Sequence, residues 1–170
     1  MKYSDALDMR GRLSLHAFDR AGNPIGTTQA NNSIVYTGRD LVAQLFLSEK
    51  IDPVRYIAVG TGNKTVEPDV DTQLQNEIFR KKLKKVDITK DVMDINTGTK
   101  AAPHTNRKII LSADLDFSEP ATQPNGNPHN LTEAGLFNAE SGGIMYNRVQ
   151  FPSISKTEDF KLTLVWEIIF

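Results

Sequence analysis

The last eleven residues of the chain constrain its fold more than any other segment. They carry an apolar side chain at every second position: Phe160, Leu162, Leu164, Trp166, Ile168 and Phe170. Because successive side chains of a β-strand point to opposite faces, this period of two predicts a strand with one buried face. At about 3.3 Å per residue the strand would span roughly 35 Å. Val165 and Ile169 on the other face indicate that its C-terminal end is covered on both sides.

Shorter apolar runs and alternations predict further strands along the chain. Their residue ranges are 13–19, 25–29, 54–60, 80–89, 107–117, 131–138 and 144–151. The first two flank Ala21-Gly22-Asn23-Pro24, whose residues favour a turn, so we expect an N-terminal β-hairpin over about 11–30. Polar and proline-rich composition predicts long loops near 90–106, which could instead be a hairpin tip, and 118–129.

One segment has the period of an amphipathic helix. Leu41, Val42, Leu45 and Phe46 fall on one side of a 3.6-residue repeat, which predicts a helix over about 38–48 that serves as a packing element. Thr37 is placed to cap it, with Asp40 in the first turn. A second, short helix is expected near 72–78. In that helix Asp71 would be the cap, and Leu74 and Ile78 would lie on the inner side.

These elements indicate a mainly β fold. The strands are not regularly interleaved with helices, which argues against a doubly wound parallel sheet. We therefore expect an antiparallel two-sheet β-sandwich with one packed α-helix at about 38–48. The chain has 170 residues, and domains usually run to roughly 100–200, so a single β-sandwich domain over 1–170 is predicted.

Composition excludes several classes of function. The chain has no cysteine, so it has no disulfide framework, thiolate nucleophile or zinc site with cysteine ligands. Its net charge of −1 argues against bulk electrostatic binding to nucleic acid or to an anionic membrane. It lacks a run of about 18 apolar residues, and Met1–Asp8 lacks the apolar core of a signal peptide. We expect synthesis in the cytoplasm.

Two motifs suggest phosphate or nucleic-acid binding, and each has a simpler interpretation. Gly60-Thr61-Gly62-Asn63-Lys64-Thr65 lacks the Gly-Lys-Ser/Thr ending of a phosphate-binding loop, so we interpret it as a turn after a strand. Arg80-Lys81-Lys82-Leu83-Lys84-Lys85 holds five cations in six residues. It could bind nucleic acid or phosphate. We favour an edge strand guarded by lysines, or a surface that pairs with an acidic neighbouring subunit.

Carboxylates and histidines give no clear catalytic or metal site. Asp114 and Asp116 alternate on one strand, where they could form an acid–base pair but more simply form a solvated face. Glu133 lies among apolar residues, so it is either a buried acid or a structural carboxylate paired with Arg148, which we favour. The histidines His16, His104 and His129 are far apart, with no partner at metal-ligand spacing.

The remaining candidates are glycosylation motifs and the single tryptophan. Asn31-Asn32-Ser33, Asn63-Lys64-Thr65 and Asn130-Leu131-Thr132 match the glycosylation pattern, which has no meaning without secretion. Trp166 lies on the apolar stripe of the last strand, so we assign it to the core rather than to a sugar-stacking site. The residues therefore predict no catalytic, cofactor-binding or metal-binding site, and no cofactor.

Six segments, taken in order along the chain, form a recognisable series: Asn32–Leu41, Ile57–Gly62, Asp71–Glu77 with Arg80, Asn130–Phe137, Met145–Phe151, and Lys156 leading to the Trp166 strand. Together they resemble a family of structural proteins of tailed phages and prophages that includes tail-fibre and baseplate proteins. The resemblance implies a virion component that works by assembly with other virion proteins and has no known chemistry. It does not fix the position on the particle.

We therefore expect a structural virion protein of a phage tail, baseplate or fibre that forms a symmetric homo-oligomer. The loops near 90–106 and 118–129 are natural places for contacts between subunits. A neck or head-surface decoration protein is an alternative. Another is a receptor-binding module for host-surface glycan, with an exposed aromatic cluster involving Tyr3, Tyr56 or Tyr146. A wall or polysaccharide hydrolase using Asp114, Asp116 and Glu133 is the third class.

Overall fold

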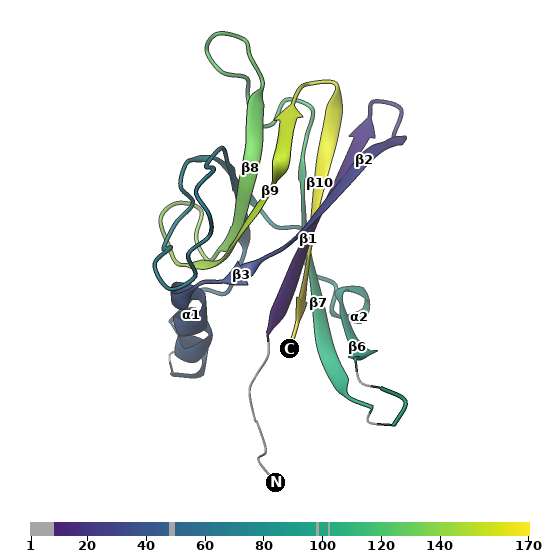
Figure 1. The fold of residues 1–170 in the computed structure, drawn as a ribbon, viewed down its shortest axis with the longest axis vertical. Helices are drawn as coiled ribbons and strands as arrows, with labels where there is room; N and C mark the ends of the chain where they lie inside the picture. Colours follow the sequence, from purple (N-terminus) through teal and green to yellow (C-terminus); the bar gives the residue numbers. More distant parts are fainter. Residues whose placement is uncertain (1–8, 48–49, 98, 102) are drawn as a thin grey trace.

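The computed structural model describes residues 9–47, 50–97, 99–101 and 103–170. Strands make up 50% and helices 10% of the structure, so the fold is mainly β, as predicted. It contains two antiparallel five-stranded sheets and two helices (Figure 1). The arrangement is consistent with the expected two-sheet β-sandwich, with a second, short helix added.

The first sheet, sheet A, has the strand order β2-β1-β10-β7-β6. Its strands, in that order, are Pro24–Asn31, Arg10–Asp19, Phe160–Ile169, Thr105–Leu115 and Val92–Asn96. The predicted N-terminal hairpin is β1–β2, which begins at Arg10 and ends at Asn31. The long last strand lies in the centre of the sheet, with Trp166 paired with Leu13 on one side and with Leu111 on the other. This central position explains why its apolar stripe is the strongest in the sequence.

The second sheet, sheet B, has the strand order β3-β9-β8-β4-β5. Its strands, in that order, are Ser33–Ile34, Met145–Lys156, His129–Phe137, Tyr56–Gly60 and Glu77–Lys82. Strand β5 lies at the edge of the sheet, in agreement with the edge-strand interpretation of the lysine-rich segment. Helix α1, Tyr36–Leu47, follows β3 and contacts β9.

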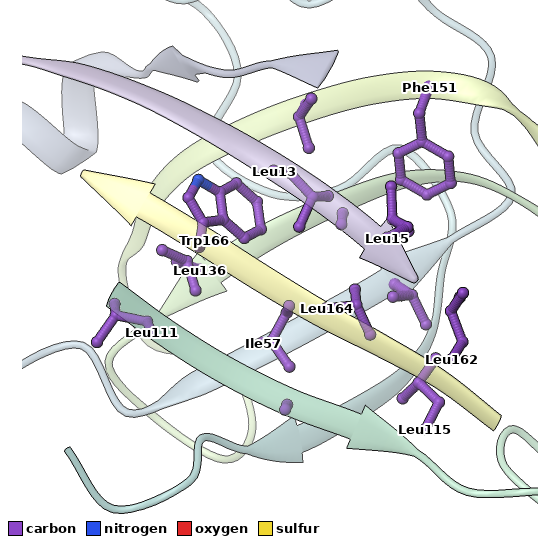
Figure 2. Close-up of a cluster of buried hydrophobic side chains, with 14 of the residues drawn as sticks. Leu13, Leu15, Ile57, Leu111, Leu115, Leu136, Phe151, Leu162, Leu164 and Trp166 are labelled. Carbon is purple, nitrogen blue, oxygen red and sulfur yellow. The ribbon is translucent and has the colours of Figure 1, made fainter. Parts of the chain in front are cut away.

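The inner faces of the two sheets share one hydrophobic core. Figure 2 shows side chains from β1, β7 and β10 of sheet A meeting side chains from β4, β8 and β9 of sheet B. Trp166 is fully buried, which confirms its assignment to the core. Its indole Nε1 donates a hydrogen bond of 3.0 Å to Asn32 Oδ1, so its one polar atom is satisfied. Burial of this apolar layer is the main stabilising contribution to the fold.

The predicted helix near 72–78 is wrong. Residues 71–76 form bends and irregular backbone instead, and β5 begins at Glu77. The backbone N–H groups of Gln75 and Asn76 donate to the carboxylate of Glu133 rather than to carbonyls of a helical turn. Asp71 does not cap a helix here, because its carboxylate accepts from Glu67 N and pairs with Arg148. A long-range partner has overridden the local capping signal.

The predicted strand over 80–89 ends early. Strand β5 stops at Lys82, and α2, Ile88–Asp91, occupies the end of that range, with Asp87 as its N-cap. The region 90–106 is not one long loop, because β6 pairs with β7 between Asn96↔Thr105 and Val92↔Ile109. The alternative of a hairpin tip is therefore the correct one.

The start of α1 also differs from the prediction. The helix begins at Tyr36, before the predicted cap, and Gly38 N and Arg39 N both donate to Val35 O. Thr37 lies inside the first turn, where its hydroxyl donates to Met145 O at 2.7 Å. Asp40 accepts from Gln44, four residues further on, rather than from the helix start. The predicted end at residue 48 lies outside the described residues.

Candidate functional site

The most elaborate polar cluster of the described structure lies on sheet B around Glu133 of β8 and Arg148 of β9. In the β8–β9 register Glu133 is opposite Gln150, so Arg148 is its diagonal neighbour on the same face. Both side chains are buried, with 0% and 1% of their surface exposed. Arg148 Nη2 and Nε lie 2.8 and 2.9 Å from Glu133 Oε2, which confirms the predicted pair.

Glu133 also accepts hydrogen bonds from the loop that joins β4 to β5. Its Oε1 accepts from Gly62 N at 3.0 Å and Asn76 N at 2.8 Å, and its Oε2 accepts from Gln75 N at 3.1 Å. Both oxygens are thus occupied by donors. A carboxylate held in this way fixes the loop to the sheet through charge-assisted hydrogen bonds.

Arg148 completes the network on the other side. Its Nη1 pairs with Asp71 Oδ2 at 2.8 Å, and its Nη2 donates to Lys64 O at 3.0 Å. The network therefore ties both ends of the 61–76 loop to the sheet. Gly62 is needed here, because a Cβ on it would lie 2.3 Å from Glu133 Oε1. The Gly60–Thr65 segment is accordingly a turn fixed by a carboxylate.

The five cations of Arg80–Lys85 divide into two groups. Arg80 is nearly buried: it pairs with Glu77 at 2.6 Å, and its guanidinium lies 3.7 Å from the centre of the Phe137 ring. Lys81 pairs with Asp116 and Glu119, and Lys84 pairs with Asp114. Within the described part of the chain, Lys82 and Lys85 make no ion pair.

Lys82 and Lys85 line the rim of a cleft of about 410 Å³ beside the end of β5. Arg55 also lies on the rim, and its side chain has no ion pair among the described residues. The floor is apolar and belongs to or packs against the core: Val54, Leu83, Val86 and Leu111. We call this feature the cationic cleft. Sequence analysis singled out the two lysines but neither Arg55 nor the floor, which comes from three separate segments.

Asp114 and Asp116 do not form an acid–base pair. Asp114 lies on β7 and contacts Lys84, Lys161 and Thr163, whereas Asp116 follows the strand and binds Lys81. Burial alone would raise the pKa of Asp114, but hydrogen bonds from Lys84 and Thr163 outweigh it and lower that pKa. Both carboxylates thus take part in ion pairs at the surface.

The other candidates lie apart from one another. His16 Nδ1 is 3.1 Å from Thr27 Oγ1 in the β1–β2 hairpin, His129 begins β8, and His104 precedes β7. Among the described residues, no group of three or more His, Asp or Glu side chains could hold a metal ion. Neither helix in these residues is long and apolar enough to span a bilayer.

Of the three tyrosines considered for a glycan-binding cluster, the structure describes Tyr56 and Tyr146. Tyr146 is 4% exposed, and burial raises its pKa to about 12. Tyr56 is half-buried on β4, and Tyr3 lies outside the described residues. Tyr146 therefore cannot belong to an exposed aromatic cluster.

Helix α1 has an exposed apolar end, which includes Leu45 and Phe46 of the predicted packing face and also Leu47. Leu41 is buried, but Leu45, Phe46 and Leu47 are 46%, 86% and 85% exposed. Figure 1 shows α1 extending past the lower ends of β8 and β9, so only its first turns lie against sheet B. We call Leu45, Phe46 and Leu47 the apolar helix end. The helical period was correct, but the sequence does not show where the sheet stops.

The base of α1 is held firmly against β9. Gly38 lies so close to Tyr146 that a Cβ at this position would be 1.8 Å from Tyr146 O. Arg39 pairs with Asp69 at 2.5 Å, and Tyr36 N donates to Pro68 O at 2.7 Å. These contacts fix the direction in which the apolar helix end points.

Comparison with known proteins gives no relative: no family model, no curated protein and no solved structure matches the chain.

Proposed function

We propose that the chain is a structural component of a tailed-bacteriophage virion, in the tail, baseplate or fibre. In this proposal it works by symmetric assembly with copies of itself and with other virion proteins. The resemblance in sequence supplies the phage context. The observation that carries the assembly role is the apolar helix end, which presents two almost fully exposed large apolar side chains on a firmly anchored helix.

The energetics of this helix end favour contact with another protein. Full burial of a Phe or Leu side chain is worth about 1.5–3 kcal/mol, so Phe46 and Leu47 together leave roughly 3–6 kcal/mol unrealised in the isolated chain. Association of two proteins costs about 4–15 kcal/mol in lost freedom. The helix end therefore serves as the centre of a larger interface rather than as a whole interface.

The segments that resemble the phage proteins also meet in space. Gly62, Asp71, Gln75, Glu133 and Arg148 come from four of these segments and belong to one buried network. A fifth segment supplies Gly38, which packs on the Tyr146 backbone of β9, the strand that also carries Arg148. This convergence supports the proposal, because the shared residues build a rigid frame rather than a reactive centre.

The experiment that tests the proposal has two parts. Sedimentation velocity from micromolar to millimolar concentration measures self-association, and immunodetection in purified phage particles measures incorporation. We expect a homo-oligomer and a fixed copy number per particle. The variant Phe46→Ser/Leu47→Ser should weaken both, whereas Ile25→Ser, which removes an apolar side chain 57% exposed on β2, should not. A monomer that is absent from particles would refute the proposal.

A further inference from the structure

We propose that the apolar helix end of one copy binds in the cationic cleft of a second copy, and that two copies exchange this contact reciprocally about a two-fold axis. This inference rests on the proposed function and names its first partner, which is another copy of the chain. The two surfaces are complementary in three respects: apolar character, charge and position.

The apolar complementarity is direct. The cleft has a floor of Val54, Leu83, Val86 and Leu111, and these side chains extend the hydrophobic core to the surface. The helix end offers Phe46 and Leu47, whose side chains are almost wholly exposed. Aromatic side chains that fill a pocket are typical anchors of protein interfaces.

The charge complementarity involves the helix dipole. The C-terminal end of a helix carries partial negative charge and unsatisfied carbonyl groups, which cations stabilise. Helix α1 has no basic residue in its last turn, so this end is not compensated within the helix. The cleft presents Arg55, Lys82 and Lys85, none of which makes an ion pair among the described residues.

The net charges of the two segments agree with this pairing. Residues 45–52, which begin with the apolar helix end, carry two acids, Glu49 and Asp52, against one base, Lys50, for a net charge of −1. Residues 82–85 carry three lysines and no acid; Lys84 pairs with Asp114, which leaves the two positive charges of Lys82 and Lys85. Opposite potentials across an interface favour its formation and fix its register.

The position of the two surfaces permits a reciprocal contact. Seven Cα–Cα steps join Leu47 to Val54, which limits their separation in one molecule to about 25 Å. The helix end does not fill the cleft of its own chain, because Phe46 and Leu47 remain exposed and Gly38 holds the base of α1 on β9. In a two-fold pair, each copy can place its helix end in the cleft of the other.

The test compares three full-length variants by sedimentation velocity. The helix-end variant, Phe46→Ser/Leu47→Ser, removes the two exposed apolar side chains. The rim variant, Lys82→Glu/Lys85→Glu, reverses the charge of the two rim lysines. The control, Lys90→Glu/Lys100→Glu, makes the same change of charge at two other exposed lysines. We expect the first two to weaken dimerisation by about 30-fold or more, the effect of a hot-spot residue, and the control to leave it unchanged. Thermal unfolding of each variant checks that it folds.

Mixing supplies a second readout. The helix-end variant keeps an intact cleft and the rim variant keeps an intact helix end, so one of the two contacts forms in a mixed pair. We therefore expect the mixture to associate more strongly than either variant alone. Higher salt should weaken the wild-type dimer, because the rim charges are exposed.

The outcomes separate this inference from the proposed function. If wild-type protein self-associates and the rim variant associates equally well, the cleft is not the binding site, and the inference is wrong while the proposed function stands. If the protein is monomeric at millimolar concentration yet present in purified particles, the inference again fails alone. Loss of dimerisation in both variants, with recovery on mixing, supports the inference.

Discussion

Replacement of Arg148 by Met tests the role of the buried network most severely. The guanidinium makes hydrogen bonds or ion pairs with Glu133, Asp71 and the Lys64 carbonyl, and it is 1% exposed. Met fills much of the space but leaves the buried Glu133 carboxyl without its guanidinium partner. Removal of one partner of a buried pair costs about 3–5 kcal/mol. In a protein of this size such a loss lowers Tm by about 6–20 °C.

The assay is urea unfolding at neutral pH, with Arg107→Met as the matched control. Arg107 pairs with Asp94 at 2.8 Å, but both side chains are more than half exposed, so this pair contributes about 0–1 kcal/mol. In Arg148→Met we also expect faster hydrogen exchange at the Gly62, Gln75 and Asn76 amides, which Glu133 holds. If the free energy of unfolding fell by no more than in the control, the network would not be what holds the loop.

Three further perturbations follow from single contacts. Gly38→Ala places a Cβ against Tyr146 O, so the free energy of unfolding should fall by about 1–3 kcal/mol or more. The control Gly26→Ala has open space around the new Cβ and should change the free energy of unfolding by no more than about 0.5 kcal/mol. Equal unfolding midpoints for the two variants would contradict this prediction. Hydrogen bonds from Lys108 and Arg12 outweigh burial and hold the pKa of Glu167 below its ordinary value of 4.5. The ionised Glu167 carboxylate therefore stabilises the fold above pH 4.5, and this stabilisation is lost as the pH falls through the lowered pKa. When Tm is measured against pH, it should fall less steeply below about pH 5 in Glu167→Gln than in the wild type. Lys156 donates hydrogen bonds to the backbone carbonyls of Asp116, Phe117 and Thr157. Lys156→Met should destabilise the fold by about 1–3 kcal/mol for each carbonyl left without a donor, and it should speed hydrogen exchange in the segment after β7. The control Lys161→Met should show neither effect.

The sequence predicts the parts of the fold that depend on periodic burial. The stripe from Phe160 to Phe170 identifies the central strand of sheet A, and the alternation in 107–117 locates β7 to within two residues at each end. Two of the wrong predictions have a common cause. The 72–78 helix and the Thr37 cap are local signals that distant groups override, namely Glu133 and the Met145 carbonyl.

The candidate surfaces were only partly accessible from the sequence. The pairing of Glu133 with Arg148 could be predicted, because both residues lie in apolar strand segments where a buried charge needs a partner. The participation of Asp71 and the 61–76 loop could not, because it depends on how sheet B folds. The periodicity wrongly predicts packing for Leu45 and Phe46, because the amphipathic period of α1 continues through Phe46 beyond the edge of the sheet.

The most direct test of the central claim is the mass of the native protein in solution across a wide concentration range. We predict reversible self-association that depends on Phe46 and Leu47. The account would be contradicted if the protein were monomeric at every concentration and were also absent from purified phage particles.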